Sequence, residues 1–180
     1  MDCGPACLRM IAAYHGKLLT LQQLREECCI DREGVSLKGI AEAAEGIGFQ
    51  TMAVRVDFGQ SISSTCLLGA PLPAIAHWNQ NHFVVVYKVN KNFVYIADPA
   101  SGRHKLSRKN FERSWCSDGD LGILLLLEKG RAFNEFFSDK GYKRPISIGF
   151  SFLIPYLSPF KRLIFQLILG MLVGSLLQMV

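Results

Sequence analysis

The stretch LPAIAHWNQNHFVVVYKVNKNFVYIAD, residues 72–98, decides the fold of this chain of 180 residues. It contains three runs rich in β-branched and aromatic residues, which are typical of strands. These runs cover residues 72–78, 82–89 and 92–98. The polar triplets NQN (79–81) and NKN (90–92) separate them and suit tight connections. We therefore expect an antiparallel meander of three strands.

A first helix is predicted near the start of the chain, at about residues 5–15. Asp2 is a suitable N-cap, Pro5 suits the first helical turn and Gly16 suits the C-terminal cap. Apolar residues recur at helical spacing between them, and Cys7 lies on this stripe. We expect Cys7 to face the core.

Two more helices precede the first strand. Thr20 and Gln23 form a capping-box pattern that opens a helix reaching to about Cys29. Ser36 is the expected cap of the next helix, and Gly46 helps to end it. Helices first and strands afterwards indicate an α+β fold, with N-terminal helices packed on an antiparallel sheet.

The rest of the soluble part completes this domain. FQTMAVRV (49–56) alternates like a half-buried strand, SRKNFERSW (107–115) has the pattern of a short capped helix, and LGILLLLE (121–128) reads as a buried closing strand. We expect a domain over 1–128 and a polar linker over 129–145.

The end of the chain differs in character. Residues 146–160 are apolar with two prolines, which favours an elbow segment at a bilayer surface. The 18 residues 163–180 carry no charge, so we expect 161–180 to be the start of a first transmembrane helix that is cut short, since a full span needs ~20 residues. Lys161 and Arg162 mark the cytoplasmic side of the inner membrane. In that reducing compartment, the six cysteines are expected to be thiols.

Charge and motifs exclude several functions. The formal net charge is +5, but the basic residues are scattered, so we expect no nucleic-acid partner. No phosphate-binding GxxxxGK loop is present in the sequence. We therefore expect no cofactor in this chain, and no ATP binding by it alone.

Three residues suggest nucleophilic catalysis. Cys3 comes just before the first predicted helix, whose N–H groups and dipole stabilise a thiolate, and Gly4 beside it leaves room for a substrate backbone. His82 begins one strand of the meander and Asp98 ends the next, so antiparallel pairing brings them side by side. His82 would accept the thiol proton and Asp98 would orient the imidazole.

The other cysteines are expected to pack rather than react. These are Cys7, Cys28, Cys29, Cys66 and Cys116. His77 is the main rival as the base, whereas His15 and His104 lie by turns and are expected at the surface. A zinc site would use Cys3, Cys7 and His15, although their spacing departs from CxxC and HxxxH pairs and Cys7 would have to leave the core.

Four motifs together resemble those of a known family. They are DCGPACLRMIAAYHGK (2–17), EGVSLKGIAEAAEGIGFQT (33–51), PLPAIAHWNQNHFVVVYKV (71–89) and IADPASG (96–102). They resemble, in the same order, the peptidase domains at the N-terminus of bacteriocin-exporting ABC transporters. The resemblance spans residues 2 to 128, and FLIPYLSPFKRLIFQLILGMLVGSLLQ resembles the entry to that family's first membrane helix.

This resemblance implies a papain-like cysteine peptidase fold. It makes Cys3 the nucleophile, His82 the general base and acid, and Asp98 the orienting group. The substrate would be a peptide precursor with a leader ending in Gly-Gly or Gly-Ala, which a narrow channel would select. The membrane and nucleotide-binding domains of the transporter would then export the cargo, and the full transporter would be a homodimer. ATP and Mg²⁺ would bind only in the nucleotide-binding domain, which this chain lacks.

One departure leaves an alternative open. The family carries a glutamine a few residues before the cysteine, as a donor to the oxyanion hole, but only Met1 and Asp2 precede Cys3 here. Losing one such donor costs about a hundred- to a thousandfold in rate, and both ends of the chain look truncated beside the family. The alternatives are a module that binds leader peptides but cleaves them weakly or not at all, or another papain-like thiol hydrolase.

Overall fold

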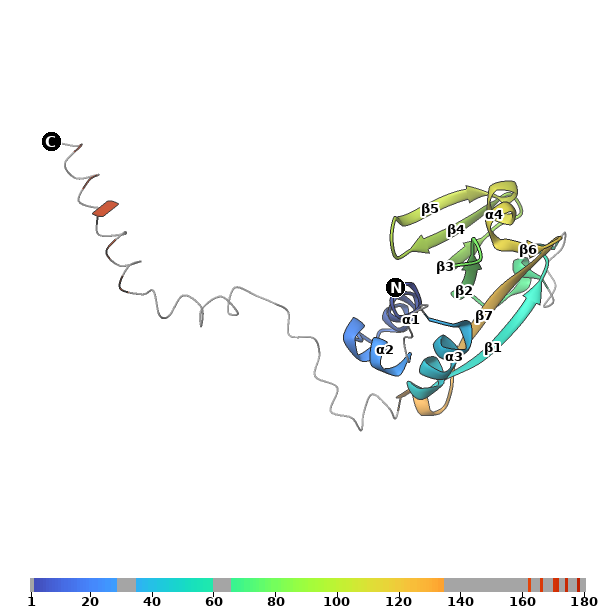
Figure 1. Cartoon of the computed structure of the whole chain (residues 1–180), viewed down its shortest axis with the longest axis horizontal. Coiled ribbons are helices and arrows are strands. Elements are labelled where there is room, and N and C mark those ends of the chain that lie inside the picture. Colours follow the sequence, from blue (N-terminus) through green and yellow to red (C-terminus); the bar gives the residue numbers. More distant parts are fainter. Residues whose placement is uncertain are drawn as a thin grey trace. The chain divides into compact units, whose positions relative to one another are not determined.

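The computed structural model of the chain describes residues 2–28, 35–59 and 66–134, together with six positions beyond residue 161. The chain divides into two compact units, Met1–Tyr142 and Lys143–Val180. Figure 1 shows the helices and strands of the first unit in chain order.

The first unit is an α+β domain, as the sequence predicts. Its helices are α1 (Cys3–Tyr14), α2 (Leu21–Glu27), α3 (Leu37–Gly46), the short 3₁₀ helix η1 (Leu67–Gly69) and α4 (Arg108–Trp115). Its strands are β1 (Phe49–Val56), β2 (Ala74–Trp78), β3 (His82–Val89), β4 (Phe93–Asp98), β5 (Gly102–Ser107), β6 (Cys116–Asp118) and β7 (Leu121–Lys129).

The strands form one antiparallel sheet in the order β1-β7-β2-β3-β4-β5, and β6 pairs with β7. The predicted meander is confirmed as β2-β3-β4. β7 is the predicted buried last strand, and it lies inside the sheet between β1 and β2, a place that the sequence does not predict. The sequence does not predict β5, which pairs with β4 and extends the meander by one more hairpin.

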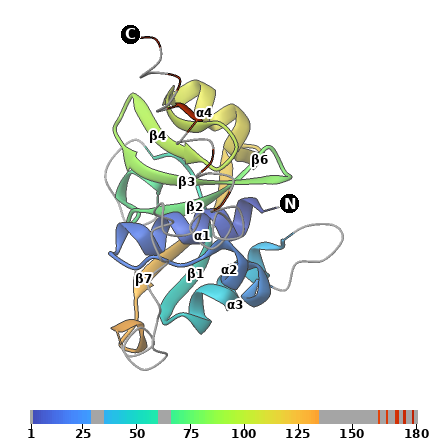
Figure 2. The ribbon, with the colours of Figure 1, turned by 90° about the vertical axis from the view of Figure 1, so that its left-hand side faces the viewer.

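The sheet buries both of its faces. In β3, Phe83 and Val85 belong to the core beneath α1, α2 and α3, whereas Val84 and Val86 belong to a second core with α4. Figure 2 shows α1, α2 and α3 gathered together and α4 at the β3–β4 end of the sheet. Because side chains alternate along a strand, an uninterrupted apolar run is what a strand between two cores requires.

Helix α1 starts earlier than predicted. Cys3 is its first residue rather than a residue before it, and Asp2 occupies the N-cap position without a capping hydrogen bond from its side chain. The other end is as predicted, because Gly16 adopts φ +80° just past the helix. The N–H groups of Gly16 and Lys17 donate back to the carbonyls of Ala13 and Ala12, both at 2.9 Å. This pattern of two bonds is the Schellman motif.

The predicted caps of the next two helices are confirmed. The Thr20 hydroxyl accepts from the Gln23 N–H, and the Gln23 side chain accepts from the Thr20 N–H, which completes the capping box of α2. The Ser36 hydroxyl accepts from the Gly39 N–H at the start of α3. Such caps stabilise helices that are too short to persist alone.

Little of the second unit is described. Its six described positions are helical, and among the described residues of the chain no helix is long and apolar enough to cross a membrane. The predicted elbow segment at 146–160 lies outside the described residues, as does most of the predicted membrane helix at 161–180.

Gly48 joins α3 to β1 at a crowded place. It has φ +92°, and a Cβ atom there would lie 2.5 Å from the Cα of Phe133. Gly102 has the same φ of +92°, but a Cβ there would meet nothing within 4 Å. The two positions therefore separate the cost of backbone strain from the cost of steric overlap.

We expect Gly48→Ala to lower the free energy of unfolding by about 2–5 kcal/mol, because left-handed strain and overpacking add. Gly102→Ala should lose only about 1–2 kcal/mol, from the strain alone. Urea unfolding followed by circular dichroism measures both. Equal losses in the two variants would contradict the role given to the contact with Phe133.

Candidate active site

The turn between β2 and β3 delivers His82 to the start of its strand. Asn79 and Gln80 in this turn have φ values of +48° and +63°, a left-handed conformation that asparagine tolerates better than glutamine. The Asn79 N–H donates to the carbonyl of Ser114 at the end of α4, at 2.8 Å. His82 then pairs with Trp78 across the hairpin. Helix α4 thus anchors the turn that fixes where β3 begins.

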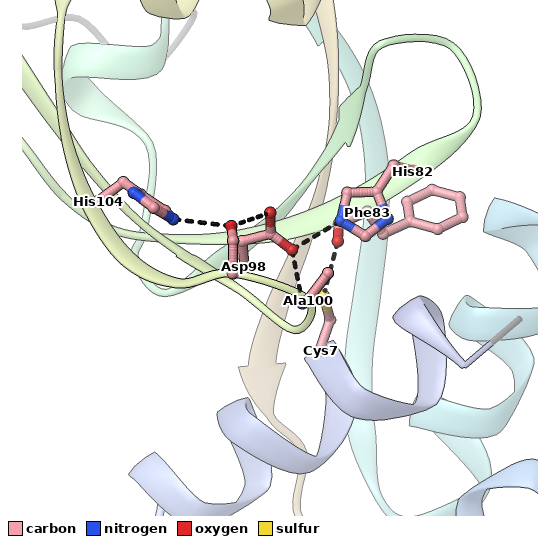
Figure 3. A network of polar contacts seen from close by, with 7 residues as sticks. Cys7, His82, Phe83, Asp98, Ala100 and His104 are labelled. Atoms are coloured by element: carbon pink, nitrogen blue, oxygen red, sulfur yellow. Dashed lines mark hydrogen bonds and ion pairs between the residues drawn. The ribbon is translucent and has the colours of Figure 1, made fainter.

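The structure brings His82 and Asp98 together. The strand pairing places Val85 opposite Ala97, so the start of β3 lies beside the end of β4. His82 Nε2 and Asp98 Oδ1 are 2.8 Å apart, and the two side chains are only 25% and 16% exposed. Figure 3 shows the imidazole and the carboxylate facing each other above the first turns of α1.

Asp98 is held as a carboxylate by several donors. Its Oδ1 also accepts from the Ala100 N–H at 2.8 Å, and its Oδ2 accepts from the Ser101 hydroxyl at 2.6 Å. Burial opposes ionisation, but the hydrogen bonds from Ser101, His82 and Ala100 outweigh it and lower the pKa of Asp98 to about 2. At neutral pH the carboxylate can therefore only accept hydrogen bonds.

This charge state fixes the proton of His82. Because Asp98 is ionised, His82 Nε2 must carry the hydrogen that joins them. In a neutral imidazole, Nδ1 is then the nitrogen with a free lone pair. His82 accordingly keeps Nδ1 able to accept a hydrogen bond, a detail that the sequence does not reveal.

Cys3 reaches this region through α1. It is partly buried at the first position of the helix, where orphan N–H groups and the helix dipole stabilise an anion. One turn further on, the buried Cys7 thiol donates to the carbonyl of Phe83 at 3.3 Å, and Phe83 directly follows His82. Among the described residues no hydrogen bond joins Cys3 to His82, and the link between them is the packing of α1 on β3.

Cys7 has the structural role that its helical position predicts. It is 0% exposed. Burial raises the pKa of the Cys7 thiol well above its ordinary value, and the negative charges of Cys3 and Asp98 raise it further. Burial likewise raises the pKa of Cys116, with help from Glu112 and Asp120. None of the cysteines in the described ranges forms a disulfide.

His15 is partly buried, whereas the sequence predicts a surface residue. Its ring packs against Phe49 and Phe133, with centroids 5.6 and 6.1 Å away, and its buried Nε2 has no hydrogen-bond partner among the described residues. Burial lowers the pKa of His15, and the charge of Lys129 lowers it further. A position beside a turn predicts exposure only when no later segment packs over it. Here Phe133, which follows β7 in the chain, packs against His15.

The rival histidine and the zinc arrangement find no support. His77 packs its ring 5.3 Å from the ring of Phe83. For zinc, Cys7 points into the core and His15 lies at the other end of α1 from Cys3. In the described part of the chain, no group of three or more potential ligands could hold a metal ion.

Gly4 has a packing role that differs from the one expected. It is buried, and a Cβ atom there would lie 2.7 Å from Cδ1 of Ile40 in α3. The absence of a side chain at Gly4 therefore lets α1 approach α3. The sequence analysis instead expects Gly4 to leave room for a substrate backbone.

The sequence does not predict the side-chain contacts of Asp2, Ser101 and His104. The Asp2 carboxylate accepts two hydrogen bonds from the Arg25 guanidinium of α2 in a bidentate pair. The bond from Arg25 Nε to Asp2 Oδ1 is 2.9 Å long. Ser101 donates to Asp98 and lies 2.7 Å from Nε2 of His104. His104 was expected to be a surface residue, but it is partly buried and belongs to this network.

A cavity of about 560 Å³ lies elsewhere, beside α4. Its lining carries three basic and three acidic residues, and Cys3, His82 and Asp98 are not among them. Arg108 in this lining is already paired with Glu112 at 2.8 Å. The equal numbers of acidic and basic residues in this lining do not favour a ligand of either charge.

Comparisons with known proteins assign the domain to a family. The sequence profile of the peptidase C39 family matches residues 1–130. The chain is 37% identical over 128 residues to the lactococcin-G-processing and transport ATP-binding protein LagD of Lactococcus lactis subsp. lactis, a match that covers 69% of this chain. The match covers only 17% of the length of that relative.

Two crystal structures are similar to the folded domain. One is a double glycine motif protease from an AMS/PCAT transporter in complex with the leader peptide, with a TM-score of 0.62, 32% identity, and 71% of this chain and 84% of that chain covered. The other is the peptidase domain of Streptococcus ComA, with a TM-score of 0.61, 27% identity, and 71% and 91% covered. The predicted papain-like α+β fold is confirmed by these matches.

The carboxylate of Asp98 should make stability depend on acid pH. Its pKa of about 2 lies below the reference value of 3.8, so between these values the native state binds fewer protons than the unfolded state. The stability that Asp98 contributes is complete above about pH 4 and is lost as the pH falls toward 2. Urea midpoints measured from pH 5 to pH 2 should therefore fall less in Asp98→Asn than in the parent chain. Asp120→Asn, at an exposed position, is the control, and parallel curves for Asp98→Asn and the parent would refute the argument.

The two cysteines of α1 should differ in reactivity. Iodoacetamide at neutral pH should modify Cys3 at least about ten times faster than Cys7, because burial and a high pKa both suppress the Cys7 thiolate. Tandem mass spectrometry of the tryptic peptide that contains both residues distinguishes them. In urea the two rates should converge, and equal rates in the native state would show that Cys7 is accessible.

Proposed function

This chain belongs to the peptidase C39 family, and from that premise we propose that it is a cysteine endopeptidase that cleaves leader peptides. The substrate is a bacteriocin or other peptide precursor whose leader ends in Gly-Gly or Gly-Ala. The cleaved cargo is exported by an ABC transporter to which the domain belongs. The observation that carries the proposal is the hydrogen-bonded pair of His82 and Asp98 beside the helix that begins at Cys3.

In this proposal Cys3, His82 and Asp98 form the catalytic triad. Three features support the assignment: Cys3 begins a helix, His82 keeps Nδ1 available because Nε2 is bonded to Asp98, and Asp98 stays ionised. The carboxylate then stabilises an imidazolium at His82 without taking its proton.

The first step forms an acyl-enzyme. His82 Nδ1 takes the proton of the Cys3 thiol, and the sulfur attacks the carbonyl carbon of the last leader residue. The tetrahedral intermediate collapses as the C–N bond breaks, and the imidazolium gives its proton to the departing amine of the cargo. The leader remains attached to Cys3 as a thioester.

The second step releases the leader. Water gives a proton to His82 Nδ1 and attacks the thioester carbonyl. The C–S bond breaks, and the thiolate recovers the proton from the imidazolium. Cys3 and His82 thus return to their starting states, and the leader leaves with a free carboxyl group.

The first turn of α1 supplies donors for the oxyanion. The N–H groups at the start of a helix have no acceptor inside it, and the first bond of α1 runs from the Ala6 N–H to the Asp2 carbonyl at 2.9 Å. The N–H groups of Cys3 and Gly4 therefore remain for the developing negative charge, whereas Pro5 has none. Backbone donors at a helix start are suited to this task because they are already oriented.

The setting of the reaction follows from the same premise. The peptidase domain would lie on the cytoplasmic side of the inner membrane, joined to the membrane domain of the transporter. The full transporter would be a homodimer, and its nucleotide-binding domain would use ATP and Mg²⁺. The partner of this domain itself is the precursor peptide.

We expect the purified chain to cut a synthetic precursor peptide after its Gly-Gly pair, as detected by mass spectrometry. Cys3→Ala and His82→Ala should each lower kcat by at least about a thousandfold, because the triad acts as a unit. Cys116→Ala is the control cysteine and should retain activity.

Two results would overturn this function. Binding of the leader without cleavage, unchanged in Cys3→Ala, would make the domain a leader-binding module. Efficient turnover of peptides with bulky residues before the cut would indicate a different thiol hydrolase.

A further inference from the structure

A row of hydrogen bonds extends from the proposed triad into the β4–β5 hairpin. Figure 3 shows the side chains of His104, Asp98 and His82 following one another along a row of dashed contacts. The Ser101 hydroxyl lies 2.6 Å from Asp98 Oδ2 and 2.7 Å from His104 Nε2. Asp98 Oδ1 continues the row to His82 Nε2 at 2.8 Å.

Counting protons gives the row a single direction. Asp98 is ionised and can only accept, so the one hydroxyl hydrogen of Ser101 points to Oδ2. The Ser101 oxygen must then accept the hydrogen of His104 Nε2. Every bond therefore donates toward Asp98, from His104 through Ser101 on one side and from His82 on the other.

The hairpin holds these residues in fixed places. Asp98 pairs with Gly102 and Ile96 pairs with His104, so Ser101 lies in the turn between the paired strands. The Ala100 N–H from the same turn binds Oδ1, the oxygen that also meets His82. Ser101 alone among these donors binds the second oxygen, Oδ2. Its bond therefore sets the rotation of the carboxylate about its last side-chain bond.

We propose that Ser101 is a positioning residue for the His82–Asp98 pair, and that His104 orients the Ser101 hydroxyl for this task. The proposal rests on the function proposed above, and it adds two residues that never touch the substrate. With Oδ2 fixed, Oδ1 stays directed at His82 Nε2, and Nδ1 of the imidazole stays free for the proton of Cys3 in the proposed reaction. Without the hydroxyl the carboxylate can rotate, and the productive orientation of His82 is populated less of the time.

Kinetics of the full chain on the Gly-Gly precursor peptide test the idea. Ser101→Ala should lower kcat about tenfold and leave KM unchanged, since small errors of orientation act on the reacting geometry rather than on binding. Ser101→Thr keeps the hydroxyl and should recover most of the loss. Thermal denaturation of each variant establishes that the fold is intact.

Two matched variants test the role of His104. His104→Phe removes the donor and should lower kcat in the same direction as Ser101→Ala, whereas His104→Gln places an amide N–H where Nε2 was and should recover activity. Arg103→Ala, an exposed neighbour in β5, controls for disturbance of the strand. Because both residues act through Asp98, the double variant of Ser101→Ala and His104→Phe should be no slower than Ser101→Ala alone.

A spectroscopic readout keeps this inference separate from the proposed function. In ¹⁵N-edited NMR spectra of the full chain, the Nε2–H proton of His82 should exchange with water about ten times faster in Ser101→Ala than in the parent, because the acceptor that protects it is less fixed. If the parent chain cuts no precursor, the proposed function fails but this measurement still decides the positioning role. A kcat within twofold of the parent, or an unchanged exchange rate, would overturn the inference.

Discussion

The packing of α1 against β3 is the contact on which the rest of this domain depends. It joins α1, which starts at Cys3, to β3, which starts at His82. The buried bond from Cys7 to the Phe83 carbonyl fixes the register between them, because it ties a set turn of the helix to a set residue of the strand. A shift of one helical turn would carry Cys3 about 5.4 Å along the helix axis, away from the start of β3. The core beneath α1 thus determines the geometry of the site as well as the stability of the fold.

The same helix gives its two cysteines opposite properties. Cys7 lies one turn inside, fully buried, where burial raises the pKa of its thiol and its hydrogen is used to satisfy a carbonyl. Cys3 stands at the first position, partly exposed, beside N–H groups that no helix carbonyl accepts. Gly4 and Pro5 between them serve the packing and the start of the helix, since Gly4 lies against Ile40. Position along the helix, rather than residue type, separates the thiol that we propose as the nucleophile from the buried one.

Much of this arrangement could be predicted from the sequence because it depends on local rules. The caps at Thr20 and Ser36, the glycine end of α1 and the meander all follow from residues that are neighbours in the chain. The pairing of His82 with Asp98 followed too, since one short connection forces a strand start beside a strand end. The position of β7 between β1 and β2 did not follow, because nothing local says which strands meet across long connections. The packing of His15 was not predicted for the same reason, because the Phe133 ring that contacts it lies far along the chain.

The failure to predict β5 has a different cause. Its sequence, GRHKLS, lacks the alternation of apolar residues that marks a half-buried strand, so the pattern reads as a loop. β5 is an edge strand, paired on one side only, and its polar composition suits an edge that must not recruit another chain. Polar residues around the beginning of β5 also belong to the network of Asp98. Ser101, in the turn just before β5, donates to the Asp98 carboxylate, and His104 in β5 binds the Ser101 hydroxyl. A segment whose polar side chains bind the partly buried carboxylate of Asp98 cannot at the same time display the apolar pattern of a core strand, which is why local rules fail where the polar network begins.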